Sequence, residues 1–350
     1  MLFDPTDPLG PAFVAAIEDA ISANLAARRA DVVGEAPPLG TVIDLLTPLA
    51  TGGKHIRPAF VWWSYVAIAG EPDDPQPLLN LAASLDITHA GLLAHDDLID
   101  AADTRRGLPS THKAIASLSH TPDDALGVAG AFVGGAWLLQ WAQQCFDECG
   151  LDITPAARGV FNSMRTRVLT GQMADAWAAA GLPLGADEPV QLIDDLKTAS
   201  YTIVGPTQLG ALIAGGDEHC LEGYSVPLGR AYQARDDVLG VFGSQDATGK
   251  PVGDDLRRAK MTSLVARGLQ LASPIQADAI KAVLGNQAAT NDAVAAATQA
   301  IADCGALARV EAEIADNLGK ALAGLDRASP TDAGRRGLES LASVSASRTK

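Results

Sequence analysis

Apolar residues recur along most of this chain at the spacing of an α-helix. Near the N-terminus every fourth position is apolar, at Phe13, Ile17, Ile21 and Leu25. Further helical segments begin near positions 78, 125, 154, 191 and 221, and Pro206 predicts a kink in the segment 191–213. Strand-type alternation of useful length is absent from the sequence, and glycine and proline fall at helix borders. The pattern predicts an all-α protein, a single domain over residues 1–350 with about ten or more helices.

One of these segments, Ala125–Phe146, contains no charged residue and is long enough to span a lipid bilayer. Its last turns carry three glutamines, and no other segment of the sequence resembles it. We interpret it as the central buried helix of a large soluble bundle, and we expect no membrane span. A spanning helix is the minor alternative.

Composition and charge narrow the class of protein. Of the 350 residues 47% are hydrophobic and 19% are charged, which is typical of a globular chain. The net charge of −16 disfavours nucleic acid and anionic membranes as partners. The four cysteines form no zinc pattern and no disulfide framework, and the N-terminal residues MLFDPTDPLG are unlike a signal peptide. These features predict a cytoplasmic protein with reduced thiols.

The stretch His89–Gly107 carries the strongest chemical signal. If it is helical, four acids line one side of it: Asp96, Asp97, Asp100 and Asp103. Such close carboxylates repel one another unless a cation lies among them, and Mg²⁺ prefers carboxylate and phosphate oxygens. Arg105 and Arg106 follow, and arginine presents a planar fork to phosphate. The stretch therefore indicates a magnesium–diphosphate site, although on its own a solvated acidic helix end explains it equally well.

An Asp-Asp pair alone carries no information in this chain. Such pairs occur at 73–74, 96–97, 123–124, 194–195, 236–237 and 254–255. We interpret 194–195 as solvated and 254–255 as helix capping, with a water-mediated metal contact as the minor alternative for 254–255. Asp236-Asp237, in contrast, lies among apolar residues, where an unpaired acid is costly. Arg-Arg-Gly recurs at 335–337 without neighbouring acids, so we interpret that copy as surface.

An ordered set of fragments identifies a family. Between Thr51 and Leu264 the chain reads, in order, GGKHIRP, THAGLLAHDDLID, RRG, GQM, KTASYT, YQARDD and TGKPVGDDLRRAK. This set resembles the trans-isoprenyl diphosphate synthases, or polyprenyl synthetases, and most of all the bacterial geranylgeranyl diphosphate synthases. The resemblance implies an antiparallel helix bundle around a deep central cavity, usually a homodimer. It also implies a Mg²⁺-dependent condensation of isopentenyl diphosphate with dimethylallyl, geranyl or farnesyl diphosphate.

The resemblance also assigns roles to residues of the two aspartate regions. By the family pattern three Mg²⁺ ions are held by Asp96, Asp100 and Asp236, with support from Asp97 and Asp237. The route of the developing carbocation would be lined by Gln172, Thr198 and Gln233.

Basic residues on either side of these acids would hold the two diphosphates. Those expected on the allylic diphosphate are Arg105, Lys197, Lys250 and Lys260. Those expected on isopentenyl diphosphate are Lys54, Arg57, His89 and Arg106.

Product length in this family depends on the residues that precede the first aspartate motif. Here they are Ala90, Gly91 and Leu92, and the first two are small. A bulky aromatic residue there would close the cavity, so its absence argues against a farnesyl-length stop. We expect geranylgeranyl diphosphate, with farnesyl or longer products as alternatives. Tight helix packing explains the two small residues almost as well.

Three departures from the family pattern stand out. Gly240 occupies the usual place of the last aspartate of the second motif, His55 that of a common arginine, and Ala136 that of an aspartate after Gly135. Two rival functions are a class I terpene cyclase and a non-catalytic regulatory subunit. A cyclase would lack the second cation cluster that begins at Lys54, and regulatory subunits usually lose aspartates of the first motif, all of which are present.

Overall fold

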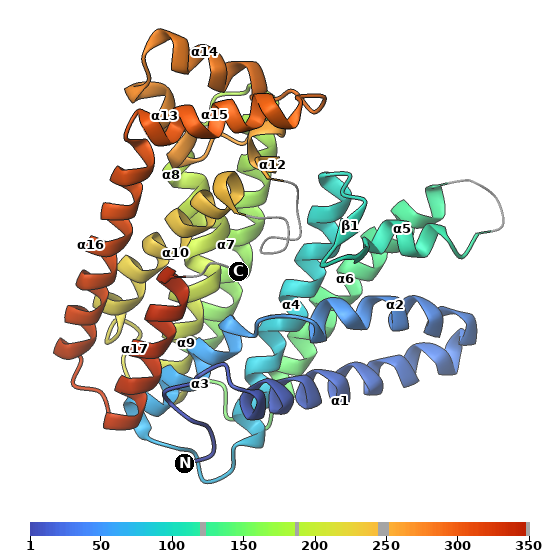
Figure 1. Cartoon of the computed structure of the whole chain (residues 1–350). Helices are drawn as coiled ribbons and strands as arrows, with labels where there is room; N and C mark the ends of the chain where they lie inside the picture. Colours follow the sequence, from blue (N-terminus) through green and yellow to red (C-terminus); the bar gives the residue numbers. More distant parts are fainter. Residues whose placement is uncertain (120–123, 186–188, 244–251, 348–350) are drawn as a thin grey trace. The chain divides into compact units, whose positions relative to one another are not determined.

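A computed structural model describes residues 1–119, 124–185, 189–243 and 252–347 (Figure 1). Within these ranges the chain is helical apart from loops and a single two-stranded hairpin, so the predicted all-α class is confirmed. The chain forms two compact units. Unit 1 comprises Met1–Pro155, Ile213–Gly215 and Thr331–Gly337, and unit 2 comprises Ala156–Leu212, Gly216–Pro330 and Leu338–Lys350. The single domain over 1–350 stays a prediction.

Unit 1 contains the N-terminal helices and the hairpin. Its elements are α1 (Pro11–Glu35), η1 (Pro37–Leu39), α2 (Gly40–Thr51), α3 (Ile56–Ala69), α4 (Gln76–Ile99), β1 (Thr104–Arg105), β2 (Leu108–Pro109), α5 (Thr111–Ala116) and α6 (Ala125–Asp147). The four apolar residues that predicted the first helix are all buried along α1. The periodicity of the sequence therefore identified the core-facing side of that helix.

Helix α4 packs mainly against α6, and the two run side by side in Figure 1. Glycines allow this close approach: a Cβ added to Gly91 would lie 2.8 Å from the carbonyl oxygen of Gly135. Among the described residues only α6 has the length and hydropathy of a membrane-spanning helix. Its buried side, which includes Leu138 and Phe146, belongs to the core of unit 1, but Leu126, Val128, Phe132 and Val133 are exposed, so the predicted central buried helix is buried on one side only.

The second Arg-Arg-Gly sequence has a structural explanation. It lies in the first turns of α17 (Asp332–Ser347), where a Cβ added to Gly337 would lie 2.2 Å from the Trp63 ring. The Thr331 hydroxyl donates to the carbonyl of Val66 at 2.7 Å and fixes the start of this helix against α3. Arg336 is exposed, in agreement with the surface interpretation.

Unit 2 contains the helices that follow. They are α7 (Pro155–Ala179), α8 (Pro189–Asp194), the π-helical segment η2 (Asp195–Val204), α9 (Gly205–Ile213), α10 (Glu222–Phe242), α12 (Asp254–Arg257), α13 (Ser263–Leu271), α14 (Pro274–Val283), α15 (Asn291–Asp303) and α16 (Ala306–Arg327). Helix α10 packs mainly against α16 and η2. The Arg235 guanidinium of α10 donates two hydrogen bonds of 2.7 Å to the carboxylate of Glu311 on α16.

The helix predicted over 191–213 is found, although its geometry changes along its length, and the kink at Pro206 stays a prediction. The segment is divided into α8, η2 and α9, and the π-helical turns end at Val204, just before Gly205 and Pro206. Proline cannot donate a backbone hydrogen bond and clashes with the carbonyl four residues earlier, so it interrupts the regular α-helical hydrogen bonding at Pro206. π-helical turns widen the ladder at such places and are frequent at functional sites.

Candidate active site

The last turn of α4 presents the first aspartate cluster. Asp97 is fully buried, Asp96 is half-buried, and Asp100 is the exposed C-cap residue. The helix ends at Ile99. Ala101, which follows the C-cap, adopts a left-handed φ of 48°, and the Ala102 amide donates to the carbonyl of Asp97 at 2.9 Å. This Schellman-type end turns the chain sharply toward the hairpin that carries the two arginines.

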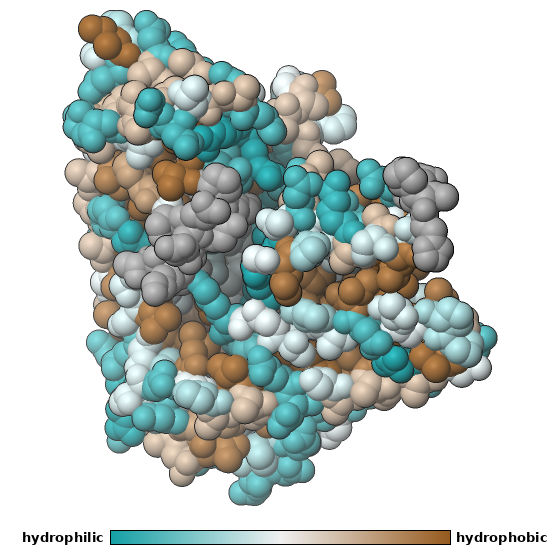
Figure 2. Space-filling model, turned by 45° about the vertical axis from the view of Figure 1, so that its right-hand side comes forward, coloured by the Kyte–Doolittle hydropathy of each residue, from teal (hydrophilic) through white to brown (hydrophobic). Residues whose placement is uncertain are grey.

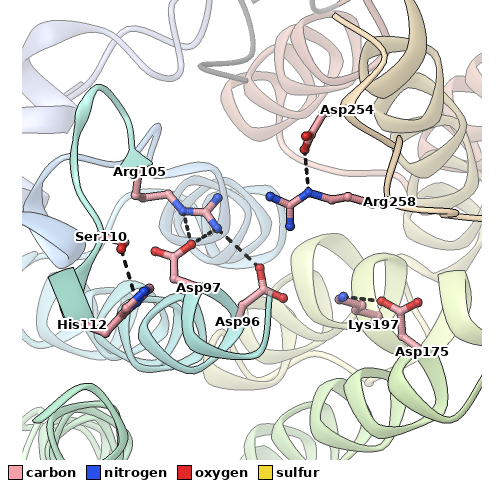
Figure 3. A network of polar contacts seen from close by, with 9 residues as sticks. All are labelled: Asp96, Asp97, Arg105, Ser110, His112, Asp175, Lys197, Asp254 and Arg258. Carbon is pink, nitrogen blue, oxygen red and sulfur yellow. Dashed lines mark hydrogen bonds and ion pairs between the residues drawn. The ribbon is translucent and has the colours of Figure 1, made fainter. Parts of the chain in front are cut away.

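The hairpin brings Arg105 back onto the acids that precede it (Figure 3). Its central residues, Arg106 and Gly107, have φ values of 53° and 77°, as the tight turn between β1 and β2 requires. The Arg105 guanidinium donates to Oδ1 of Asp97 through Nε at 2.8 Å and again through a terminal nitrogen. It also lies 3.5 Å from Oδ2 of Asp96. The positive charge of Arg105 therefore offsets part of the negative charge of both carboxylates.

Three arginines surround His89, which lies two turns before the acids on α4. Burial, followed by the charges of Arg57, Arg106 and Arg105, lowers the pKa of His89 well below its ordinary value. The imidazole is consequently neutral near neutral pH and can donate one hydrogen bond without adding charge. Four of the side chains expected to bind diphosphate thus lie within electrostatic reach of one another inside unit 1.

The turn Gly52–His55, between α2 and α3, completes this group. A Cβ added to Gly52 would lie 3.2 Å from the Arg106 guanidinium, so the turn passes directly beside that side chain. Lys54 is exposed on this turn, and Arg57 follows in the first turn of α3. Glycine at 52 therefore favours the close approach of backbone and guanidinium, whereas a Cβ at Gly53 would make only ordinary contacts.

In unit 2 the π-helical segment carries Lys197. Its ammonium donates to Oδ2 of Asp175 on α7 at 2.7 Å (Figure 3). A Cβ added to Gly171 would lie 2.6 Å from the Lys197 backbone nitrogen, so glycine at 171 allows η2 to lie against α7 at this point. The predicted residues Gln172 and Thr198 are both half-buried on these two elements.

The second aspartate pair lies on α10. Asp237 is buried, and it accepts hydrogen bonds from the Gln233 amide at 2.8 Å and from the Ser263 backbone at 3.1 Å. Burial, opposed by the charge of Lys260, raises the pKa of Asp237 to about 7. Asp236 is half-buried beside it. The supporting role expected of Asp237 stays a prediction.

Lys260 lies in an acidic surrounding. Its ammonium is 3.7 Å from Oδ2 of Asp255, whose charge is the main cause that raises the pKa of Lys260. The charges of Asp237, Asp175 and Asp236 act in the same direction. Lys260 therefore stays fully charged at neutral pH. The remaining predicted cation, Lys250, lies outside the described residues.

The departure at Gly240 has a steric counterpart. A Cβ at this position would lie 2.0 Å from Oδ2 of Asp255, so the carboxylate of Asp255 fills the space beside α10 that a side chain at 240 would need. Asp254, in contrast, pairs with Arg258 four residues later, at the end of α12: Nε of Arg258 lies 3.0 Å from Oδ2 of Asp254. Both acids lie in the first turn of α12, but no side-chain hydrogen bond caps this helix, so the capping interpretation is not confirmed.

The interpretation of Asp194-Asp195 as a solvated pair is wrong for Asp194. This side chain is 9% exposed at the end of α8. Burial, followed by the charge of Asp237, raises its pKa to about 8. An amphipathic pattern cannot tell which of two adjacent acids faces the protein when the helix changes to π geometry at that residue.

Sequence reasoning also missed Asp175, the partner of Lys197. The available signal was its spacing, because an acid three residues after Gln172 lies on the same side of a helix. It missed Asp86 as well, which contacts His55 across 31 sequence positions. No local pattern identifies a contact between residues so far apart in the sequence.

Residues 42–301 match the family model for polyprenyl synthetase. The chain belongs to this family. A geranylgeranyl pyrophosphate synthase from Corynebacterium glutamicum, crystallised with isoprenyl diphosphate and magnesium, is 34% identical to this polyprenyl synthetase. The two structures superpose with a TM-score of 0.89 and cover 96% of this chain and 98% of the other.

Curated relatives of this polyprenyl synthetase differ in the products they are named for. A farnesyl diphosphate synthase of Mycobacterium tuberculosis is 30% identical over 260 residues, or 72% of this chain and 67% of the relative. A short chain isoprenyl diphosphate synthase of Methanothermobacter thermautotrophicus is 29% identical over 242 residues, or 68% and 70%. The chain is a prenyltransferase of the trans-prenyl diphosphate synthase family, and the resemblance drawn from the sequence fragments is confirmed.

The family implies a divalent metal, and the donor set of each unit fits Mg²⁺. Among the described residues no three acidic, histidine or cysteine side chains converge into a preformed cage. Mg²⁺ does not need one, since it usually binds one or two carboxylates and takes further oxygens from substrate and water. Oδ2 of Asp97 is buried without a hydrogen-bond partner among the described residues. Asp96 is half-buried and Asp100 is exposed, so both are accessible to a metal ion from solvent.

Proposed function

We propose that this polyprenyl synthetase condenses isopentenyl diphosphate with an allylic diphosphate in a Mg²⁺-dependent reaction. One observation carries the proposal: His89 and the three arginines around it lie beside the Asp96–Asp97 pair within one unit. Cations and carboxylates in such proximity suit a diphosphate bound together with a metal ion. The family membership supplies the reaction class.

The residues divide into those that hold metal and those that hold diphosphate. Asp96, Asp100 and Asp236 would hold three Mg²⁺ ions, which neutralise the charge that develops on the departing diphosphate. Asp97 and Asp237, both buried, would support these acids: Arg105 contacts both Asp97 and Asp96, and the Gln233 amide orients Asp237. The allylic diphosphate would be bound by Arg105, Lys197, Lys250 and Lys260.

The second substrate would be held by the cations around the Gly52–His55 turn. Lys54, Arg57 and Arg106 supply positive charge to isopentenyl diphosphate, and neutral His89 supplies one hydrogen-bond donor. Once the allylic carbon–oxygen bond ionises, the isopentenyl double bond attacks the carbocation and a proton leaves, which the departing diphosphate can accept. Gln172, Thr198 and Gln233 would stabilise the carbocation by their side-chain dipoles.

For product length we propose geranylgeranyl diphosphate, with farnesyl or longer products as alternatives. The support is the similarity to a synthase named for that product. Gly91 adds little, because its hydrogen faces Gly135, Leu138 and Leu139 of α6 and is explained by helix packing. Ala90 is fully buried as well. Leu92 is the half-buried residue of the three.

We propose that the enzyme is a cytoplasmic homodimer. Two surfaces support the dimer, each within its own unit. In unit 1, α6 exposes the side chains Leu126, Val128, Phe132 and Val133, and in unit 2, α7 exposes Leu169, Met173 and Trp177. Figure 2 shows hydrophobic residues reaching the surface on one face of the molecule. Light scattering of Phe132→Glu, which places a charge on this apolar side, should report a monomer if α6 forms the interface.

The reaction is tested by mass spectrometry of the products. Purified protein is incubated with Mg²⁺, isopentenyl diphosphate and, in turn, dimethylallyl, geranyl and farnesyl diphosphate. We expect a geranylgeranyl product that disappears in Asp96→Ala and on chelation of Mg²⁺ by EDTA. Asp73→Ala, which removes an exposed acid of another Asp-Asp pair, is the matched control and should remain active. If folded wild-type protein condenses isopentenyl diphosphate with none of the three allylic diphosphates, the regulatory-subunit alternative is favoured instead.

A further inference from the structure

A buried histidine–aspartate pair connects the aspartate helix to the glycine turn. Nδ1 of His55 lies 2.6 Å from Oδ2 of Asp86 on α4, and the two residues are 1% and 5% exposed. His55 itself has a left-handed backbone, with φ of 52°, at the residue before α3. This conformation is energetically unfavourable for a non-glycine residue, so a specific interaction must hold His55 in it.

The pair stands at the centre of the cations expected to bind isopentenyl diphosphate. Lys54 precedes His55, and Arg57 follows two residues later. A Cβ added to Gly53 would be 3.8 Å from the His55 ring and 3.8 Å from the Arg106 guanidinium, so the turn passes between these side chains. The charge of Asp86 also acts on Arg106. One carboxylate on α4 therefore contacts the turn and influences the arginine on its other side.

The charges that face the imidazole favour its protonated form. Burial alone would lower the pKa of His55, but the hydrogen bond and charge of Asp86, with the charge of Glu18 on α1, outweigh it and raise the pKa. Glu18 Oε1 lies 3.6 Å from Nε2, which has no hydrogen-bond partner among the described residues. Lys54 and Arg57 flank His55 in the sequence, and the Arg106 guanidinium lies beside the same turn, where a Cβ added to Gly53 would be 3.8 Å from it and from the His55 ring.

We propose that His55 and Asp86 are positioning residues that hold the Gly52–His55 turn in its diphosphate-binding conformation while His55 is an imidazolium. Neither residue touches substrate: Asp86 is fixed on α4, and its ion pair with His55 sets the backbone from which Lys54 and Arg57 extend. When His55 loses its proton, the ion pair becomes a weaker hydrogen bond from a neutral imidazole to the Asp86 carboxylate, and the strained turn relaxes. The inference rests on the proposed assignment of Lys54 and Arg57 to isopentenyl diphosphate.

The sign of the pH effect follows from the raised pKa. The ion pair is fully formed below the ordinary histidine pKa and is lost as the pH rises through the raised value in the folded protein. The KM for isopentenyl diphosphate should therefore increase on the alkaline side, while kcat and the KM for the allylic diphosphate change little.

The decisive comparison is between wild type, His55→Arg and His55→Gln. Arginine keeps a permanent cation opposite Asp86, so the part of the alkaline rise in KM for isopentenyl diphosphate that depends on His55 should disappear. The ionisation of the substrate affects both enzymes equally, so it cancels in the ratio of their KM values. Glutamine keeps a donor but no charge, so its KM should lie about tenfold above that of wild type below the pKa of His55 and should converge with wild type as the pH rises through that pKa. His219→Gln is the matched control, because His219 also lies between two carboxylates but is exposed.

A measurement on the unmodified enzyme guards against variants that fail to fold. The imidazole resonance of His55 can be assigned by its absence from the spectrum of His55→Arg or His55→Gln, whichever folds, and titrated by NMR. Because binding and protonation are linked, isopentenyl diphosphate should shift the pKa of His55 upward. If neither variant folds, the same linkage is read in wild type by calorimetry at several pH values, as proton uptake on binding.

The outcomes separate this inference from the proposed function. Parallel pH profiles of wild type and His55→Arg, or a pKa of His55 that isopentenyl diphosphate leaves unchanged, would overturn the inference while condensation stands. Tight, pH-dependent binding of isopentenyl diphosphate without condensation would support the inference while the proposed reaction fails. Loss of kcat in His55→Gln at unchanged KM would also overturn it, since a positioning role for this turn acts on binding.

Discussion

The ammonium of Lys197 donates to the carboxylate of Asp175 at 2.7 Å, and both side chains are about one-quarter to one-third exposed. Lys197 belongs to the π-helical segment and Asp175 to α7, so one ion pair joins two elements of unit 2 at a residue expected to bind the allylic diphosphate. Because the pair is accessible to solvent, its contribution is to orientation more than to stability.

Removal of this partner should therefore affect catalysis more than folding. In Asp175→Asn the lysine loses its fixed direction, and kcat/KM for the allylic diphosphate should fall about tenfold, equivalent to ~1.4 kcal/mol. The melting temperature should change little. Asp316→Asn breaks an exposed lysine–aspartate pair on α16 and serves as the control. Equal kinetics in the two variants would contradict a role for Asp175.

The two Arg-Arg-Gly sequences provide a second matched comparison. Arg106 lies beside Gly52 and His89. Arg106→Ala should raise the KM for isopentenyl diphosphate ~10- to 150-fold, which corresponds to a loss of about 1.5–3 kcal/mol of binding free energy. Arg336 is exposed at the start of α17, and Arg336→Ala should leave every kinetic constant near that of wild type. Steady-state kinetics with varied isopentenyl diphosphate distinguishes the two.

Gly240 should not tolerate even a methyl group. Alanine there would place its Cβ 2.0 Å from Oδ2 of Asp255, and overpacking of this kind costs about 1–3 kcal/mol. Gly319→Ala on α16, where a Cβ meets nothing within 4 Å, should instead be neutral or stabilising. Chemical denaturation measures both. The double variant Gly240→Ala, Asp255→Gly should recover part of the loss, and full additivity would exclude the contact.

Gly91 should report on helix packing before it reports on product length. Gly91→Phe forces a ring into the contact with Gly135 and Leu139, so we expect a loss of stability of at least ~1–3 kcal/mol. Leu92→Phe, one residue further at a half-buried position, should be tolerated better. Thermal melting is compared with product analysis of each soluble variant. A stable Gly91→Phe enzyme with shortened products would restore the cavity interpretation of Gly91.

Asp194 should make the protein less stable as the pH rises. Its pKa in the folded protein is about 8, above that of an unfolded aspartate at about 3.9, so the folded state binds more protons between these values. The carboxyl group then costs stability progressively between about pH 4 and pH 8. Asp194→Asn should raise the melting temperature at pH 8 by at least ~2 °C and have little effect near pH 4. Asp195→Asn is the control.

A good part of the molecule was predictable from local sequence. The buried stripe of α1 followed from spacing alone, because a helix places every third and fourth residue on one side wherever it lies. The cluster of Asp96, Asp97 and Arg105 followed too, since a helix end and a short hairpin bring residues nine positions apart into contact. The order of the fragments identified the family, which matches over residues 42–301.

Other properties were decided only by tertiary structure. Asp194 and Asp195 are adjacent and chemically identical, yet one is buried, because burial depends on helices that the local sequence does not describe. His55 and Asp86 are 31 positions apart, and Asp255 reaches the surface of α10 at Gly240 from a different helix. The sequence by itself determined the helices and the chemistry available to them. Only the packing of distant segments decided which carboxylates are desolvated, which cations they face and which glycines leave them room.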